Sequence, residues 1–476
     1  MSERARKLLR AALLSSILSA CAVGPDYTRP QSAAPAHFSA AATRIYAEED
    51  APAGFWGQFG DATLDHLVSD ALAANHDLRI ALARWREARA LHREARFDLA
   101  PTVTAASGYT REELPSAQSF GLGSALEERY YDAGFDASWE LDLFGRVRRG
   151  VEAARAEVDS AEASLRDAQV SVTAEVARTY FELRGAQGEL EVAERNVINQ
   201  RATRDLTASL LDAGRGTELD TSRAQAQLSS TLASIPPLES AIARSVHRLA
   251  VLTGRPPEAL SAELRVPRAL PPLPRLVAIS DPATLLRRRP DIRVAERGLA
   301  ASSAQIGVAV GDLFPKVTFN GSFGYAAGSL GALGESGTRQ YVIGPAISWA
   351  AFDLGRVRAR IDQAHARNDE ALAVYEQTVL RALEETENAL VAHARAREQL
   401  AEVEHEAQAS ETAAQIARAR YEGGMVGFLE VLDAERTQLT AEDQLAQSRT
   451  ETATSLIAVY KALGGGWQGA PLPHRR

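Results

Sequence analysis

The sequence has a single cysteine among its 476 residues, so the chain cannot form an internal disulfide. After the first twenty residues it also lacks long hydrophobic runs. No later window approaches the ~18 uncharged apolar residues that a membrane-spanning helix needs. If the chain crosses a membrane, we therefore expect it to do so with strands.

Motifs for catalysis are missing too. The sequence has no Walker-type phosphate loop, no His-Glu-x-x-His helix and no Cys-x-x-Cys pair, and its nine histidines are scattered. One G-x-G-x-x-G match, Gly464–Gly469, follows a helical pattern instead of a strand and no helix comes after it, so we treat it as chance. We expect no enzyme activity, no metal and no cofactor other than a covalent lipid.

The lone cysteine stands in a targeting segment. Basic residues at Arg4, Arg6, Lys7 and Arg10 precede an apolar stretch, and Leu18-Ser19-Ala20-Cys21 resembles a bacterial lipoprotein cleavage box. A single cysteine is otherwise most often an inert buried thiol. In this setting we expect residues 1–20 to be a signal peptide and Cys21 to carry palmitate and further acyl chains, which anchor a protein stably to a bilayer.

Positive charge is in deficit. The full chain has a net charge of -9, and loss of residues 1–20 removes four basic residues and one acidic residue, which makes the mature charge -12. Nucleic-acid binding needs clustered Lys and Arg, so this balance disfavours it.

What the sequence does contain is an internal repeat. The segment from Ser138-Trp139 to Arg148 matches the segment from Ser348-Trp349 to Arg358 at an offset of 210 residues. Upstream, the run to Pro101 matches the run to Pro315 at an offset of 214. The change in offset predicts loops of different length inside the two copies, because length variation belongs in loops.

Long helices are the main element of each copy. After Gly145, small and apolar residues recur with a 3.5-residue period, typical of a supercoiled helix, and no proline interrupts residues 146–211. Such a helix would be about 100 Å long. We expect it to end at Gly214 and Gly216, and its second copy at Gly423 and Gly424, each followed by a shorter helix.

The segments before the long helices contain shorter helices and strands. Helices are expected over about 62–99 and 282–313, with Asp61 and Asp281 as N-caps. From 131 to 143 apolar residues alternate with polar and acidic ones, which predicts a strand. Pro345 predicts a bulge or break in the last strand.

The alternation fits either a half-buried sheet or a membrane-spanning one. Strands of about ten residues with aromatic residues near their ends favour the membrane. Four strands cannot close a barrel, and an open edge in lipid is excluded, so several chains must share one barrel. Three chains would provide twelve strands.

The expected organisation has six parts. They are a signal peptide at 1–20; an acylated segment at 21–61; a first repeat at 62–265, with strands at about 102–110 and 130–143 and a hairpin at 145–254; a Pro-rich linker at 266–280; a second repeat at 281–466, with strands at about 316–326 and 340–350 and a hairpin at 355–464; and a tail at 467–476.

Seven segments of the chain carry a resemblance to a known family: Cys21–Pro30, Trp56–Asp61, Arg289–Ile292, Gly344–Trp349, Phe352–Arg356, Tyr421–Asp433 and Tyr460–Trp467. In these segments the chain resembles the TolC-like outer-membrane efflux channels in their lipoprotein, NodT-type branch. The resemblance implies a mainly α fold with a small β part, and a homotrimer that forms a 12-stranded β-barrel in the outer membrane of a Gram-negative bacterium and a 12-helix α-barrel in the periplasm. It also implies a periplasmic adaptor, an inner-membrane pump of the RND type, and outer-membrane lipid as partners.

The resemblance further implies a periplasmic gate near the two helical turns. By position its acids are Asp220, Glu430 and Asp433, with Tyr421 beside them. Family members often carry a basic residue where this chain has Val426, and Arg215 is the candidate substitute. Acids in a first helical turn also simply complement the helix dipole, and the two interpretations stay open. Gly214, Gly216, Gly423 and Gly424 mark the turns expected to dock the adaptor.

The leading hypothesis is a passive export conduit powered by an inner-membrane pump. The alternative is a periplasmic coiled-coil adaptor or structural lipoprotein, which also uses long hairpins but has no need of strands with one acidic face. A lipid-anchored hydrolase ranks third, because no nucleophile and base are apparent.

Overall fold

The computed structural model describes residues 22–31, 34–39, 45–47, 49, 54–114 and 126–467. These residues form two compact units. Unit 1 takes its described residues from 22–31, 84–114, 126–162 and 294–376, and unit 2 takes the remainder, in 34–83, 163–293 and 377–467. Each unit therefore draws on both sequence repeats.

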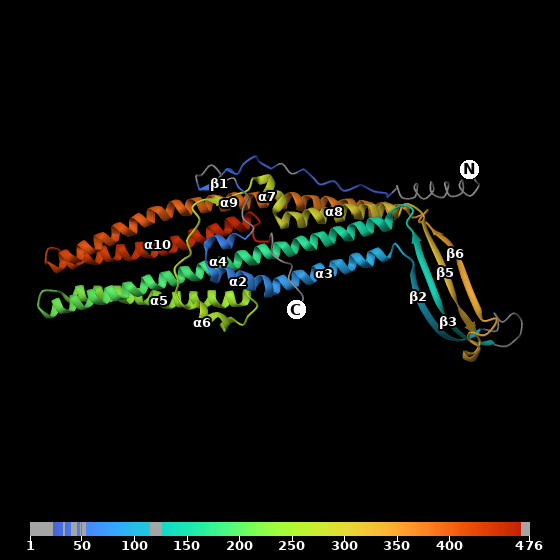
Figure 1. Cartoon of the computed structure of the whole chain (residues 1–476), viewed down its shortest axis with the longest axis horizontal. Helices are drawn as coiled ribbons and strands as arrows, with labels where there is room; N and C mark the ends of the chain where they lie inside the picture. The colour runs from blue at the N-terminus through green and yellow to red at the C-terminus, as the bar shows by residue number, and fades with distance from the viewer. Residues whose placement is uncertain are drawn as a thin grey trace. The chain divides into compact units, whose positions relative to one another are not determined.

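Helices make up most of the described chain (Figure 1). They are α2 (Ala62–Ala74), α3 (His76–Phe97), α4 (Arg146–Asp212), α5 (Glu218–Leu252), α6 (Ser261–Leu264), α7 (Pro282–Arg288), α8 (Pro290–Gly311), α9 (Leu354–Glu422) and α10 (Phe428–Ala462). The long helices and their shorter partners follow the expected pattern. Within the described residues, no helix is long and apolar enough to cross a membrane.

The expected helices over 62–99 and 282–313 are each split in two. Asn75 is extended, with ψ of 135°, and its side chain accepts a hydrogen bond from the Asp77 amide at 2.8 Å, so it ends α2 and caps α3. Arg289 is extended at ψ of 124° because it precedes Pro290. Both expected N-caps are confirmed: Asp61 accepts from the backbone of Thr63 and Leu64, and Asp281 from that of Thr284.

Unit 1 contains one antiparallel sheet in the order β2-β3-β5-β6. Its strands are β2 (Thr102–Leu114), β3 (Leu126–Leu141), β5 (Lys316–Ala327) and β6 (Arg339–Ser348). The expected bulge at Pro345 is wrong: Pro345 pairs in register with Phe319. Within one protomer β6 is an edge strand, the kind of strand in which proline is found without a break.

Unit 2 has an aromatic core. Phe55 stacks on Tyr460 of α10 with ring centroids 4.8 Å apart, and Phe59 meets Phe181 of α4 edge-on at 4.9 Å. A short parallel pair, β1 (Tyr46–Ala47) with β4 (Val277–Ala278), belongs to the same unit. Burial of these rings holds the Phe55–Phe59 turn against both hairpins.

Candidate functional site

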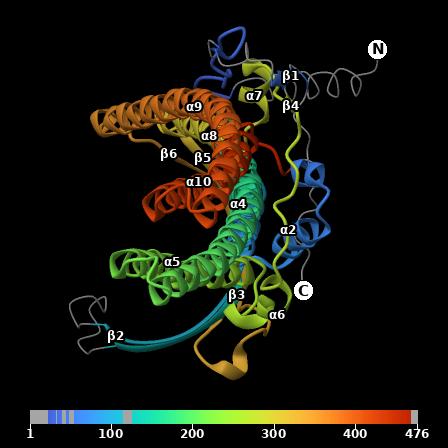
Figure 2. The ribbon, with the colours of Figure 1, turned by 90° about the vertical axis from the view of Figure 1, so that its left-hand side faces the viewer.

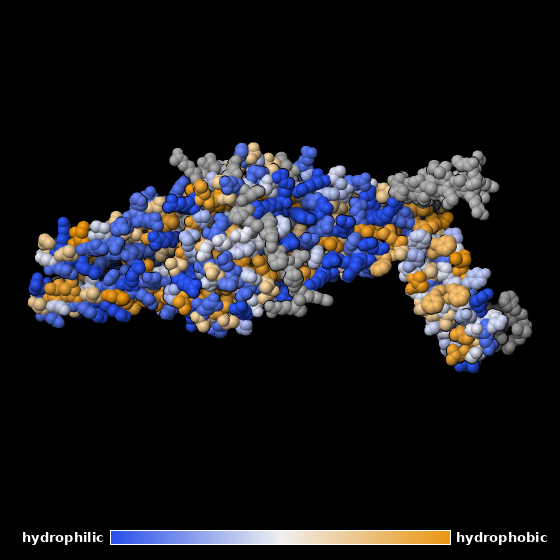
Figure 3. Space-filling view, viewed as in Figure 1, coloured by the Kyte–Doolittle hydropathy of each residue, from blue (hydrophilic) through white to orange (hydrophobic). Residues whose placement is uncertain are grey.

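One face of the sheet is apolar and exposed. The register places most of the large apolar residues of the four strands on this face. They are between 41% and 71% exposed: Val103, Tyr109, Phe135, Phe319, Phe323, Tyr341, Ile343 and Ile347. Hydrophobic residues gather over the strands in Figure 3. An apolar face of this extent marks a surface that meets lipid or another protein.

The opposite face is polar. On β3 it carries Asp132, Asp136 and Glu140, which alternate with the apolar residues. Ser138 donates to the side-chain oxygen of Asn320 at 2.9 Å on the same face. In this unit, β2 and β6 each have a strand neighbour on one side only, so both edges have unpaired backbone groups.

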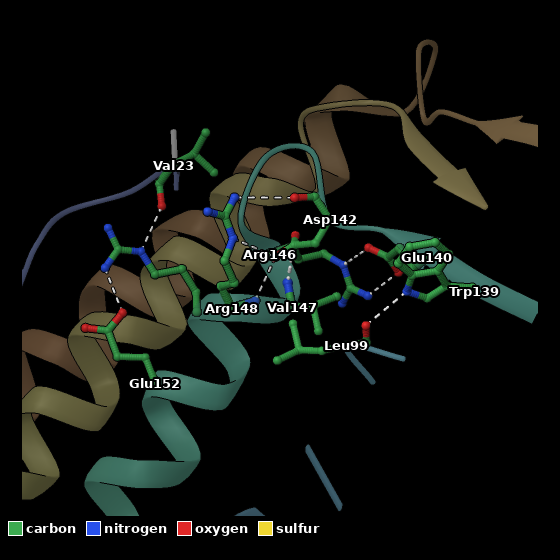
Figure 4. Close-up of polar contacts among 10 residues, drawn as sticks. Val23, Leu99, Trp139, Glu140, Asp142, Arg146, Val147, Arg148 and Glu152 are labelled. Carbon is green, nitrogen blue, oxygen red and sulfur yellow. Dashed lines mark hydrogen bonds and ion pairs between the residues drawn. The ribbon is translucent and has the colours of Figure 1, made fainter. Parts of the chain in front are cut away.

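The sheet joins the long helix α4 through residues 138–149, here called the first junction (Figure 4). The Trp139 indole donates to the Leu99 carbonyl at 3.1 Å. Glu140 accepts two hydrogen bonds from Arg146, at 2.9 and 2.6 Å. Asp142 caps α4 by accepting from the Val147 and Arg148 amides at 3.1 and 2.9 Å. These contacts fix the direction of the chain as it changes from strand to helix.

The segment 22–27 is held at the first junction. Val23 donates to the Phe144 carbonyl at 3.0 Å, and Gly145 has a φ of +81° with Ala22 packed on it so closely that a Cβ there would lie 2.5 Å from the Ala22 Cα. The buried Arg149 donates to the Val23 and Gly24 carbonyls and pairs with Asp26 at 2.7 Å and Glu152 at 2.8 Å.

Further along, Tyr27 donates to Glu296 of α8 at 2.5 Å and lies under the guanidinium of Arg297. Burial raises the pKa of the Tyr27 hydroxyl well above its usual range, and the bond to Glu296 adds to that shift. The hydroxyl therefore stays a donor throughout the physiological range.

Residues 348–359, the second junction, repeat only part of this arrangement. Trp349 donates to the Leu313 carbonyl at 2.9 Å, as Trp139 does to Leu99. At the positions that match Glu140, Asp142 and Arg149 by the 210-residue offset, the second junction has Ala350, Phe352 and Ala359. The Phe352 side chain is fully exposed.

The two tip turns lie between the helices of each hairpin, at residues 213–217 and 423–427. Figure 2 shows the hairpins of unit 2 from one end. In the first turn Gly214 has a φ of +70° and the Arg215 amide donates to the Leu210 carbonyl; in the second, Gly424 has a φ of +71° and the Met425 amide donates to Arg420. Both helices thus end in the glycine motif that satisfies free carbonyls. The backbone at Gly216 and Gly423 is not left-handed.

The expected gate residues occupy different environments. Asp220 belongs to a capping box in which Thr217 donates to its carboxylate at 2.6 Å. Burial and the nearby Asp220 charge raise the pKa of Tyr421, whose ring lies 5.7 Å from Phe428. The structure therefore places the Asp220 charge close enough to Tyr421 to act on its pKa. It also shows Asp220 in the helix-capping role that was the alternative interpretation.

The other expected gate residues lie on the surface of the chain. Glu430 and Asp433 are exposed on the first turns of α10. Arg215 is exposed and makes no ion pair with any residue that the structure describes, and its substitution for a basic residue at Val426 stays a prediction. Cys21, the expected lipid site, lies outside the described residues, as do the signal peptide and all of the tail after Trp467.

The structure also shows a charged cluster that the sequence did not reveal. Arg418 of α9 forms an ion pair with the buried Glu435 of α10, and Thr203 of α4 donates to Glu435 at 3.0 Å. Arg418 and Glu435 are 17 positions apart across a turn, and Thr203 is more than 200 residues away. No periodicity connects them.

Comparisons with known proteins agree with this geometry. The family model "Outer membrane efflux protein" matches residues 67–255 and 282–465. Outer membrane protein OprJ of Pseudomonas aeruginosa is 32% identical over 457 residues, which are 96% of this chain and 95% of OprJ. Nodulation protein T of Rhizobium leguminosarum bv. trifolii is 31% identical over 459 residues, 95% of this chain and 96% of the relative. The solved outer-membrane channel OprN is 47% identical with a TM-score of 0.89, and the match covers 94% of this chain and 100% of OprN.

Proposed function

Because the chain belongs to the outer membrane efflux protein family, we propose that it is the outer-membrane channel subunit of a tripartite efflux system. In this role it is a passive conduit, and an inner-membrane pump drives export through it by way of a periplasmic adaptor. The observation that carries the proposal is the sheet of unit 1, which exposes one apolar face and has an acidic face opposite. A periplasmic adaptor or structural lipoprotein has no use for such a sheet.

The unpaired edges of β2 and β6 support a shared barrel. In lipid, every backbone group must be paired within protein, so the β6 edge of one protomer must meet the β2 edge of the next. Three protomers contribute twelve strands, which is within the range of membrane barrels. We propose a homotrimer with the apolar face toward lipid and the acidic face toward the pore.

Lipid attachment at Cys21 is part of the proposal. The residues directly after Cys21 are held at the first junction, where the apolar sheet begins. Acyl chains on Cys21 would enter the membrane beside that sheet. Incorporation of labelled palmitate into the wild-type protein, and its loss in Cys21→Ser, is the expected result; equal labelling of both proteins would contradict it.

The tip turns are the proposed docking points for the adaptor, and an RND-type transporter is the proposed inner-membrane partner. Both turns expose polar backbone and small residues at the end of a hairpin. In the trimer, the tip turns would carry rings of acidic side chains from Asp220, Glu430 and Asp433. Such rings would make the pore selective for cations. Neutralising Asp220 and Asp433 together, as Asp220→Asn with Asp433→Asn, is expected to raise single-channel conductance. Unchanged conductance and cation preference would discard these gate residues.

The test of the main proposal uses neighbouring residues on opposite faces of β6. Ile343 and Val342 are similarly exposed, at 67% and 70%, but Ile343 is on the apolar face. Ile343→Asp is expected to block channel formation in planar bilayers, whereas Val342→Asp leaves channels intact with altered ion selectivity. Wild-type protein should migrate as a heat-modifiable trimer and form channels. A monomer without pores would overturn the proposal.

A further inference from the structure

A cavity of about 270 Å³ lies in unit 2, between α4, α10 and the Pro-rich linker that precedes β4. Its walls come from residues 184–195 of α4, 267–270 of the linker and 442–450 of α10. These lining residues are separate from the sheet, the two junctions and the tip turns. The volume is close to the lower end of the range for ligand-binding pockets, so the cavity suits a small organic molecule.

Arg184 of α4 lines this cavity and is buried without a counter-charge. It is 1% exposed, its Nη1 donates to Gln187 Oε1 at 2.7 Å and to the Val266 carbonyl at 3.1 Å, and its guanidinium lies 4.8 Å from the centre of the Tyr180 ring. Arg184 forms no ion pair with any residue that the structure describes, and its Nε has no hydrogen-bond partner among them. Because a buried cation is costly unless an anion compensates it, an anion bound in the cavity would be stabilised by Arg184.

The lining as a whole is positive. Four arginines and two glutamates contribute to it: Arg184, Arg195, Arg268, Arg449, Glu191 and Glu442. Arg268 of the linker donates to a threonine hydroxyl at 2.8 Å and makes no ion pair within the described part of the chain. Both glutamates already have partners, since Glu191 pairs with Arg195 at 3.7 Å and Glu442 accepts from Asn196 at 3.1 Å. The cavity therefore favours an anionic ligand.

Apolar side chains complete the walls, and a glycine keeps the space open. Val192, Leu270 and Leu445 line the cavity. A Cβ at Gly188 would have no contact within 4 Å beyond its own helix turn, so a larger side chain at this position would fill the space. Apolar walls of this kind accept the hydrocarbon part of a ligand.

The second repeat lacks these features. By the 210-residue offset, Ala394 matches Arg184 and Glu398 matches Gly188. The long helix α9 forms without either residue, so helix formation does not account for the arginine and the glycine of α4.

We propose that this cavity binds a small organic anion, a carboxylate with a short apolar body. Arginine binds carboxylates through charge-assisted hydrogen bonds, and Arg184 and Arg268 supply the charge from two different elements. The apolar body of the ligand packs on Leu270 and Leu445. A free organic acid and the C-terminal end of a peptide present the same group, and the experiment distinguishes these two sources. The site does not depend on the channel function.

The experiment is isothermal titration calorimetry of the purified full-length protein with butanoate as the carboxylate probe. One site per protomer is expected, and binding should weaken as salt is added. Butanamide has a similar shape without the charge, and inorganic phosphate has charge without an apolar body. Each of these should bind at least about tenfold more weakly than butanoate. N-acetylalanine is the probe for the end of a peptide.

Four variants test the role of the lining. Arg184→Gln removes the buried charge and should weaken butanoate binding at least about tenfold, whereas Arg268→Gln should weaken it several-fold. Gly188→Leu should abolish binding, because it fills the space while favouring the helix. Arg178→Gln is the matched control, since Arg178 lies on the same helix, is about half exposed and forms ion pairs away from the cavity. If Arg184→Gln fails to fold, Gly188→Leu and Arg268→Gln decide the question.

The outcomes decide both the site and the source of its ligand. Saturable butanoate binding that is lost in Arg184→Gln and Gly188→Leu but kept in Arg178→Gln supports the site. Tighter binding of N-acetylalanine would assign the site to peptide ends, and tighter binding of butanoate to free organic acids. The proposal is overturned if neither carboxylate binds, if butanamide or phosphate binds equally well, or if Arg184→Gln and Gly188→Leu both bind like the wild type. The channel proposal is tested separately, by the bilayer recordings.

Discussion

The first and second junctions share a backbone plan but differ in what they bind. In each junction a tryptophan donates to a backbone carbonyl: Trp139 to that of Leu99, just before β2, and Trp349 to that of Leu313, just before β5. Each junction leads into a long helix. Only the first has the buried Arg149, which holds residues 23–26, and the strained Gly145. The two repeats therefore share the residues that form the strands and the long helices. They differ at the junctions, because only the first junction contacts segment 22–27, which has no counterpart in the second repeat.

The tip turns diverge in the same way. Helix α5, after the first turn, is capped by Thr217 and Asp220, whereas the N-cap of α10 is Gly427, which has no side chain to cap the helix. Conversely, the second hairpin carries the Arg418–Glu435 pair and the first does not. Each hairpin thus stabilises its tip by a different means, one local and one tertiary.

Loss of Arg149 should have the largest effect on this comparison. Arg149→Gln removes a buried cation from two carbonyls and two carboxylates, and we expect it to lower the free energy of unfolding by about 2–4 kcal/mol. Arg356→Gln in the second junction removes an exposed pair with Asp353 and should cost less than about 1 kcal/mol. The midpoint of thermal unfolding followed by circular dichroism measures both. Equal shifts would show that segment 22–27 adds no stability at the first junction.

Alanine at the matching glycines should give effects of opposite sign. At Gly145 a Cβ would meet Ala22 in a left-handed backbone conformation, so Gly145→Ala is expected to destabilise by about 2 kcal/mol. Gly355 lies in α9 with open space around it, and Gly355→Ala should be neutral or stabilise by up to about 1 kcal/mol. Thermal midpoints again provide the measurement. A stabilising Gly145→Ala would contradict the close packing of Ala22.

The two long helices should also differ in pH dependence. Burial, together with the Asp443 charge, raises the pKa of Glu189 in α4 to about 7, whereas the matching residue of α9 is Gln399. Because the fold favours the protonated form, the contribution of Glu189 to stability is largest at low pH and is lost as pH rises through about 7. Since solvent screens this partly exposed group, the loss between pH 6 and 8 should be less than about 1 kcal/mol. Glu189→Gln should flatten this dependence. An unchanged pH profile in the variant would rule out Glu189 as its source.

The smallest effects are expected at the tip turns. Thr217→Ala removes the cap of α5 and should cost about 1 kcal/mol, whereas Gly427→Ser adds a cap to α10 and should stabilise it by a few tenths of a kcal/mol, about 0.3. Hydrogen exchange of the first amides of α5 and α10 reports each end separately. Faster exchange in α10 after Gly427→Ser would show that the glycine is required there.

Much of the fold could be predicted because its signals are local. Alternation along 131–143 predicted β3, the 3.5-residue period predicted α4 and α9, and glycines predicted where those helices end. The breaks at Asn75 and Arg289 were missed, because the helical pattern continues on both sides of each. Pro345 was misread because a sequence does not say which strand is at an edge.

The candidate site could be predicted only in part. Asp220 and Tyr421 lie beside the tip turns, since each stands close to a helix end that glycine marks, and their role in a gate stays a prediction. The hydrogen bond between Asp220 and Thr217 is also local, because the two residues are three positions apart at the start of one helix. The sequence did not predict that segment 22–27 binds at the first junction, because Arg149, which holds it there, is more than 120 residues away in the chain.

By itself, the sequence determined the doubling, the alternation of strand faces, the long helices and the net charge of the full chain, because each depends on residues a few positions apart or on composition. Only the tertiary structure decided that Arg149 holds residues 23–26 and that Thr203 meets Arg418 and Glu435. These contacts join residues from separate elements. Their strength comes from burial, which removes competing water and which no local pattern in the chain records.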